Sequence, residues 1–360
     1  MATRALHVHA SFACAHSGVC CTAGWPIPVE PDRQAALGPR LLPLANGACP
    51  EFDADRRLCR VHDADGERAL PRACHHFPRR ARVDPQGTTV ALSHFCPTAA
   101  RALLDPARTL DVIPEPAAFP SERDYDGLDA REAWAPLVAR DLLFDHASYD
   151  LWERWLVHTL GVDGATPDGW TRACLTVAAA AERLRAWPRQ HAQDFATWTS
   201  SVVAGAAPSS PPTTADALAR YAPYLAADVW HRVRATVPSG ARLRADLSAS
   251  TGADREPGPN RAPAPALTGA AAWARARYVA ACAFGTWSAY DGWGVRSQLA
   301  ELFVAAGVFE AECAHAADRH RRALDDALIL EAVQQSDLLL RHLTDRAALC
   351  AWYHEAEWEV

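Results

Sequence analysis

The chain has 360 residues, of which 49% are hydrophobic and 22% charged, a balance that excludes collagen-like, fibrous and wholly disordered proteins. All 36 basic residues are Arg, and with 43 acidic residues the net charge is −7, which argues against a nucleic-acid binder because such proteins normally carry a basic face. The sequence contains 76 Ala, and both Ala and Arg favour helices, so we expect a mainly α-helical protein.

The first hundred residues are rich in turn-forming residues. Pro and Gly recur through 10–105, which leaves little room for long helices. Residues 25–29 alternate apolar residues with Pro and predict a short extended segment. Residues 88–92 follow a turn signal and form the best strand candidate. A helix is expected to start at Cys96-Pro97 and to end near Leu104.

Helical periodicity dominates after a Pro-rich connector at 111–128. Apolar residues recur at spacings of three and four over 134–142 and 151–159, and their Trp residues are expected to lie in the core. Residues 238–267 are rich in Pro, Gly, Ala and Ser and predict a flexible surface loop. Further helices are expected over 170–186, 190–204, 213–236, 268–289, 295–322 and 324–353.

These patterns divide the chain into three parts. We expect a loop-rich, metal-binding cysteine-cluster domain over 1–110, the connector at 111–128, and an all-helical domain over 129–360 that packs against the first. A loop-rich unit of this kind buries little apolar surface per residue, and such units typically depend on a metal for stability.

The 11 cysteines are unevenly distributed. Four are scattered through the helical part and are expected to be plain packing residues: Cys174, Cys282, Cys313 and Cys350. Seven fall in the first 96 residues: Cys14, Cys20, Cys21, Cys49, Cys59, Cys74 and Cys96. We see no secretory signal and no apolar window long enough to cross a membrane, so we expect a cytoplasmic protein with no membrane partner. Because cytoplasmic thiols stay reduced, the seven are candidate metal ligands; disulfides and inert thiols are the alternatives.

The spacing of the cysteines suggests how they meet. Cys49 and Cys59 are spaced like the two ends of a short hairpin. The vicinal pair Cys20-Cys21 is expected to point its side chains in different directions, and so to serve two metals, or one metal and a second function. Groups that could hydrogen-bond to the sulfurs or to a bound carboxylate are His75, His76, Arg79 and His94, although only one of the first two can face the metal. A solvated turn is the alternative for Arg79 and Arg80.

Four segments resemble a known family: Cys14 to Trp25 with its Cys-Cys-x-x-Gly-Trp ending, Cys49-Pro50 to Cys59, Leu70 to Arg79, and Cys96-Pro97 to Arg101. They are similar to the cysteine-cluster proteins described as zinc- or iron-chelating (YkgJ type), and within that superfamily most similar to the flagellin lysine N-methylase (FliB) group. The resemblance covers about 10–105. It implies an iron–sulfur cluster that works with S-adenosylmethionine to methylate lysines of a flagellin-like protein substrate.

One position departs from the family pattern. Ser17 stands where the opening motif usually has its second Cys, and a hydroxyl is a poor ligand for soft metals. The site must therefore complete its ligands otherwise, for example through His16, or bind one fewer metal.

Two classes of function stay open. Seven clustered cysteines exceed the four that one structural zinc uses, which favours an iron–sulfur cluster, with zinc as the alternative. No strand followed by G-x-G-x-x-G is present, so a Rossmann-type site for S-adenosylmethionine is not visible. The hypotheses are an S-adenosylmethionine-dependent protein-lysine N-methylase with an iron–sulfur cluster, and a non-enzymatic zinc- or iron-chelating structural or interaction protein.

Overall fold

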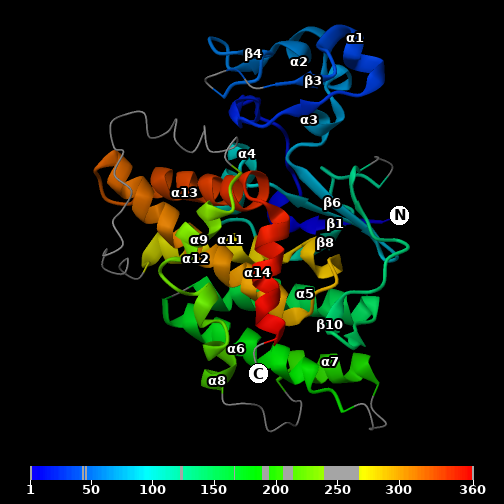
Figure 1. Cartoon of the computed structure of the whole chain (residues 1–360), viewed down its shortest axis with the longest axis vertical. Helices are drawn as coiled ribbons and strands as arrows, with labels where there is room; N and C mark the ends of the chain where they lie inside the picture. Colours follow the sequence, from blue (N-terminus) through cyan, green and yellow to red (C-terminus); the bar gives the residue numbers. More distant parts are fainter. Residues whose placement is uncertain are drawn as a thin grey trace.

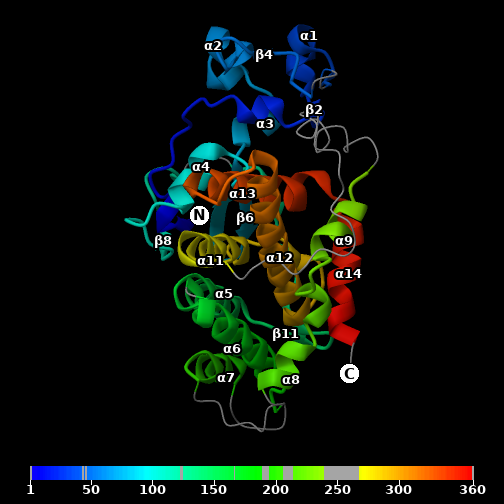
Figure 2. The ribbon, with the colours of Figure 1, turned by 90° about the vertical axis from the view of Figure 1, so that its left-hand side faces the viewer.

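The computed structural model describes residues 2–42, 44, 47–121, 125–165, 167–188, 194–205, 214–238 and 267–358. Over these residues the protein is mainly helical, as the composition predicts. Two perpendicular views show an elongated molecule, with a cysteine-rich lobe at one end of the long axis and helices α6 (Pro167–Arg185) and α7 (Phe195–Val203) at the other (Figures 1 and 2).

A five-stranded mixed sheet lies between the lobe and most of the helices (Figure 1). In β7 every residue is buried, and the side chains alternate between two apolar clusters, with Ala91 on one face and Val90 and Leu92 on the other. The predicted strand at 88–92 is thus confirmed as part of β7. The strand order is β8 (Val112–Pro114), β1 (Thr3–Leu6), β7 (Gly87–Leu92), β6 (Arg79–Asp84) and β9 (Gly127–Asp129).

The edges of this sheet come from the predicted Pro-rich connector. β8 pairs antiparallel with β1, and β9 pairs parallel with β6, so each of the two outer strands has only one partner. Pro114 at the end of β8 fits an edge position, because Pro cannot donate a hydrogen bond to a strand on its outer side. The connector therefore completes the sheet as well as linking two parts of the chain.

Between β1 and β6 the chain leaves the sheet and forms the cysteine-rich lobe, residues 13–78 (Figure 1). Its apolar core is small and centres on Ile27, Val29 and Leu41. The predicted extended segment at 25–29 is confirmed as β2. The short elements of the lobe are β2 (Ile27–Pro28), α1 (Gln34–Leu37), β3 (Arg40–Leu41), β4 (Phe52–Asp53), β5 (Leu58–Cys59), α2 (Arg60–Asp65) and α3 (Arg72–His76).

The helical body packs around α11, in which 12 of the 15 residues are buried. The largest apolar cluster joins residues of the sheet side, such as Leu6 and Leu103, to Leu160 and Tyr278 of the helices. The expected boundary at residue 110 falls within this unit, and the division into three parts stays a prediction. The other helices are α4 (Pro97–Leu103), α5 (His146–Gly161), α8 (Thr214–Ala219), α9 (Val229–Ala235), α11 (Gly269–Ala283), α12 (Val295–His320), α13 (Asp326–Leu338) and α14 (Arg346–Trp358).

Three predicted helices differ from the structure. Residues 134–142 form a hairpin, β10 (Leu137–Ala139) and β11 (Leu142–Leu143), so the part after 129 is not all helical; Pro136 precedes the first strand, and Trp134 is 83% exposed rather than in the core. The helix over 213–236 is split into α8 and α9 around Pro223. The helix over 324–353 is interrupted by a π-helical turn, Leu339–Leu343, and α14 begins after Asp345, whose carboxylate accepts the backbone N–H of Ala347.

Two other expectations concern loops and membranes. The predicted flexible loop at 238–267 lies outside the described residues except at its two ends. Among the residues that the structure describes, no helix combines the length and the apolar character needed to cross a bilayer.

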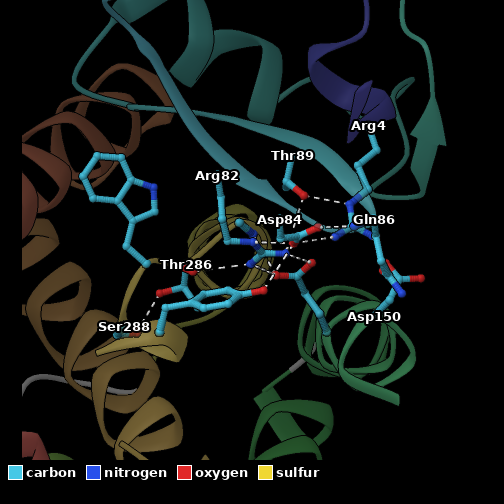
Figure 3. Close-up of polar contacts among 12 residues, drawn as sticks. Arg4, Arg82, Asp84, Gln86, Thr89, Asp150, Thr286 and Ser288 are labelled. Atoms are coloured by element: carbon cyan, nitrogen blue, oxygen red, sulfur yellow. Dashed lines mark hydrogen bonds and ion pairs between the residues drawn. The ribbon is translucent and has the colours of Figure 1, made fainter. Parts of the chain in front are cut away.

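A buried ion network fastens the sheet to the helices (Figure 3). Arg82 of β6 is fully buried, and its guanidinium donates to Glu153 of α5 at 2.8 Å and to Asp84 at 3.3 Å. Burial acts to lower the pKa of Arg82, but the charge and hydrogen bond of Glu153, together with Tyr149 and Tyr290, hold it raised. Glu153 also accepts the backbone N–H of Gly285 at 3.1 Å. Arg4 lies 3.6 Å from Asp84, so two arginines face the two buried carboxylates.

Candidate metal centre

All seven N-terminal cysteines line one cavity of about 650 Å³ between the lobe and the body. They reach it from different elements: Cys20 and Cys21 from the 3₁₀ turn Val19–Thr22, Cys59 from the end of β5, and Cys74 from α3. Cys14 comes from the loop before that turn, Cys49 precedes β4, and Cys96 caps α4. The fold therefore brings together every residue that the sequence singled out as a candidate ligand.

The opening loop of the lobe requires a glycine at position 18. Gly18 has φ +70°, and a Cβ there would lie 2.6 Å from the carbonyl oxygen of Arg57 and 2.6 Å from the ring of Phe52. The backbone can therefore turn tightly against the β4–β5 hairpin only without a side chain. Cys49 N–H donates to the Cys21 carbonyl at 2.6 Å, which fixes the second cysteine segment against the first. The predicted hairpin between Cys49 and Cys59 is present, with Phe52 paired to Cys59.

Three thiols form a hydrogen-bonded group. Hydrogen bonds join the Cys21 thiol to the sulfurs of Cys20 and Cys59, and they lower the pKa of Cys59 to about 6 and also lower the pKa of Cys20. The same bonds raise the pKa of Cys21, which keeps its proton. The expectation that Cys20 and Cys21 point apart is wrong, because the 3₁₀ turn brings both sulfurs within hydrogen-bonding range and onto the same cavity.

Three further ligand candidates, Cys49, Cys74 and Cys96, have thiols that favour the protonated form. Burial raises the pKa of Cys74 to about 12 and also raises the pKa of Cys49 and Cys96. The nearby sulfurs add to this effect, since each thiolate disfavours the next. A bound cation would reverse the balance, because metal binding requires and stabilises deprotonated thiols.

The inner wall of the cavity is aromatic and includes two residues from the far end of the chain. Trp25 packs against His342 with ring centres 4.8 Å apart, and against Phe95 at 5.6 Å. Of the described residues that line the cavity, only Arg341 and His342 come from beyond position 98. Both belong to the π-helical turn. Sequence reasoning did not identify them as site residues; the polar pair within the leucine run 338–343 was the available signal.

The polar neighbours expected around the centre divide into two groups. His75 lines the cavity and His76 does not, as expected for adjacent residues, and His75 Nδ1 lies 3.4 Å from Glu67. Arg79 lines the cavity and donates to the His75 carbonyl at 3.1 Å. Arg80 is the second residue of β6, with its guanidinium 5.0 Å over Trp287, so these two arginines are not in a solvated turn.

His94 is absent from the described lining of the cavity. Its Nε2 lies 3.2 Å from Nε2 of His9, and both rings are almost fully buried. Burial lowers the pKa of both imidazoles, so both are neutral and one donates to the other. The expectation that His94 assists the centre is wrong, because the turn between β7 and α4 directs this side chain inward, where its ring packs on Tyr278 of α11.

Ser17 and His16 do line the cavity, as the resemblance suggested for a replaced ligand. His16 has φ +50° and stacks on His62 with ring centres 4.7 Å apart. The four scattered cysteines behave mostly as predicted: Cys174, Cys282 and Cys313 are buried in the main core, whereas Cys350 is half-buried with its thiol 3.7 Å from Asp291.

The spacing of the thiols bears on the type of metal. Within the part of the chain that the structure describes, no group of three or more His, Cys, Asp or Glu side chains converges tightly enough to hold one ion. Structural zinc binds four donors at about 2.0–2.3 Å around a single point. The candidate ligands are soft thiols, as iron–sulfur clusters require, but they surround a cavity and do not converge on one point as the ligands of a single zinc ion do.

In comparisons with protein-family profiles, curated proteins and solved structures, nothing matches this chain. The geometry of the cavity is therefore the basis for assigning a function.

Proposed function

We propose that the cavity of the lobe holds an iron–sulfur cluster bound by cysteine thiolates. The observation that carries the proposal is that all seven N-terminal cysteines, from Cys14 to Cys96, line one cavity of about 650 Å³. Thiolates are the ligands that iron–sulfur clusters use, and four suffice for one cluster. Because a cluster contains several iron atoms, its ligands stand further apart than those of a single ion, which agrees with thiols that surround a space.

The charges of the cavity support a centre of this kind. Arg79 lines it, and its positive charge would offset part of the negative charge that thiolates and sulfide give to a cluster. The small apolar core of the lobe supports the same proposal, because Ile27, Val29 and Leu41 alone bury little surface and a bound metal would supply the missing stability.

The alternative is a structural zinc. The hydrogen bonds between the Cys21 thiol and the sulfurs of Cys20 and Cys59 favour it, since a zinc site needs several thiols near one point. On that alternative the protein is a zinc- or iron-chelating structural or interaction protein rather than an enzyme. Methylation of lysines with S-adenosylmethionine, which the sequence resemblance implies, is the enzymatic use that an iron–sulfur cluster would permit.

The test is anaerobic purification followed by iron, zinc and acid-labile sulfide analysis and a visible absorption spectrum. We expect a brown protein with equal amounts of iron and sulfide, whose colour bleaches in air. Cys20→Ser should lose the colour. The matched control Cys350→Ser removes a half-buried thiol that does not line the cavity and should keep it. A colourless protein with one zinc, or one without metal, would overturn the proposal.

A sample that contains the cluster then allows the enzymatic use to be tested. The reduced protein is mixed with S-adenosylmethionine and assayed for its cleavage, with Cys20→Ser as the control that lacks the cluster. Cleavage that requires the cluster supports the methylase hypothesis. A stable cluster without cleavage contradicts that hypothesis and leaves the metal centre intact.

A further inference from the structure

The π-helical turn between α13 and α14 reaches back to the cavity from the other end of the chain. Such turns are rare and are often found at functional sites, because they shift side chains out of the regular helical positions. Here the turn Leu339–Leu343 carries His342 into the wall of the cavity. Trp25, which ends the opening cysteine motif, packs directly on this imidazole.

A chain of hydrogen bonds fixes the protonation of the His342 ring. Asp337 is fully buried, and its carboxylate accepts from the Ser93 hydroxyl at 2.6 Å, from Arg341 Nε at 2.8 Å and from the Phe95 backbone N–H at 3.3 Å. Since the hydroxyl of Ser93 gives its proton to the carboxylate, its oxygen must accept from His342 Nε2, which lies 2.8 Å away. Nε2 therefore carries the hydrogen, and Nδ1 has a free lone pair.

Nothing described competes for that lone pair. Among the described residues, no hydrogen bond to His342 Nδ1 is present. Metal binding requires the neutral imidazole, and the hydrogen bond between Nε2 and Ser93 leaves Nδ1 as the nitrogen that can bind. A nitrogen without a hydrogen cannot donate to a thiolate; it can bind a metal or accept a proton.

We propose that His342 Nδ1 is a nitrogen ligand of the metal centre, supplied by the helical body. This inference rests on the proposed function. Histidines that bind metals usually donate their other ring N–H to an acceptor that fixes the ring, and here Ser93 and Asp337 form that support. An eighth donor also compensates for Ser17, which stands in place of a thiolate. His16 is less suited, because its ring is stacked on His62.

The test uses the full-length holoprotein, purified anaerobically, reduced, and studied by pulsed electron paramagnetic resonance. Wild type should show a strongly coupled nitrogen whose signal changes when the histidines are labelled with ¹⁵N. His342→Gln should lose this coupling. The matched control His354→Gln alters another partly buried histidine that packs on a tryptophan, with ring centres 3.5 Å apart, but does not line the cavity; it should keep the coupling.

A second variant keeps a ligand at this position. His342→Cys replaces a neutral imidazole with a thiolate, so the reduction potential of the centre should fall. A metal centre with no strongly coupled nitrogen, or one whose coupling and potential are unchanged in both His342 variants, overturns the inference and leaves the proposed function standing. A protein without iron and sulfide overturns the proposed function itself, so the two failures are distinguishable.

Discussion

Replacing Arg82 with methionine tests the ion network that joins the sheet to the helical body. Arg82 is fully buried, and its removal leaves Glu153, which is 1% exposed, without a cation. Asp84 keeps a partner, because Arg4 lies 3.6 Å away and the Tyr290 hydroxyl donates to it at 3.3 Å. Stranding one member of a buried pair costs about 3–5 kcal/mol, against a total stability of about 5–15 kcal/mol. Arg82→Met should therefore lose about a fifth or more of the free energy of unfolding.

The double variant Arg82→Met/Glu153→Leu separates the stranded charge from lost packing. Replacing both partners by apolar residues removes the unpaired carboxylate, so the double variant should be more stable than Arg82→Met alone. The measurement is urea unfolding followed by circular dichroism for wild type, both single variants and the double variant. A cost below about 1 kcal/mol for Arg82→Met, or single-variant costs that add within about 0.5 kcal/mol, would refute this reasoning.

The pH dependence of the single variant gives an independent check. In wild type burial opposes ionisation of Glu153, but Arg82, with Arg4 and the Gly285 N–H, lowers its pKa, so the ion pair stabilises the fold above the unfolded pKa and is lost in acid. Without Arg82, burial is opposed only by the more distant charge of Arg4 and by the Gly285 N–H, so we expect the pKa of Glu153 to rise above its unfolded value. The folded variant then binds more protons than the unfolded chain, so its deficit should shrink as the pH falls toward 4.5. A deficit that is constant between pH 7 and pH 4.5 would contradict this account.

Three further predictions concern the cavity and its surroundings. Gly18→Ala should strain the backbone by about 1–2 kcal/mol and clash with the Arg57 carbonyl, and so lower the metal content. The control Gly38→Ala has φ +72° but open space, so it should strain the backbone without a clash and keep the metal. Equal metal content in both variants would contradict this prediction. Ser93→Ala should weaken metal retention against a chelator by about 10–100-fold, because it releases the ring of the proposed ligand; unchanged retention would argue against that support. Burial lowers the pKa of His9, so the unfolded chain binds an extra proton below pH 6.5 and stability falls by about 2 kcal/mol by pH 5. This part of the slope should vanish in His9→Gln, and a slope that persists would exclude His9 as its source.

Local patterns in the sequence predicted many of the elements. The strand β7, the start of α4 at Cys96-Pro97 and the hairpin between Cys49 and Cys59 each depend on a few neighbouring residues, and all three are present. The long helices α6, α11 and α12 also follow from local periodicity. The sequence predicted a helix at 134–142 instead of the hairpin. Val138 and Leu142 are both buried and four residues apart, a spacing that fits one face of a helix and also fits the two strands of a tight hairpin.

Contacts between distant parts of the chain could not be predicted in this way. β1 pairs with β7 across more than 80 residues, and the connector at 111–128 supplies both edges of the sheet. His94 lies two residues before Cys96 and was therefore expected near the metal, yet its ring is buried against His9, 85 residues earlier in the chain. The residues that neighbour His94 in the sequence do not predict which way its side chain points.

The sequence by itself determined which metal-binding groups are available: seven soft thiol donors within the first 96 residues. The type of donor and its spacing along the chain can be read directly from the order of residues. Only the tertiary structure decided that all seven line one cavity and that a turn near the other end of the chain closes its wall. His342 lies 249 residues from the Ser93 hydroxyl that it contacts. Such a contact depends on how the helices pack over the sheet. The free energy gained by burying apolar surface determines that packing, and it brings together side chains that are far apart in the sequence.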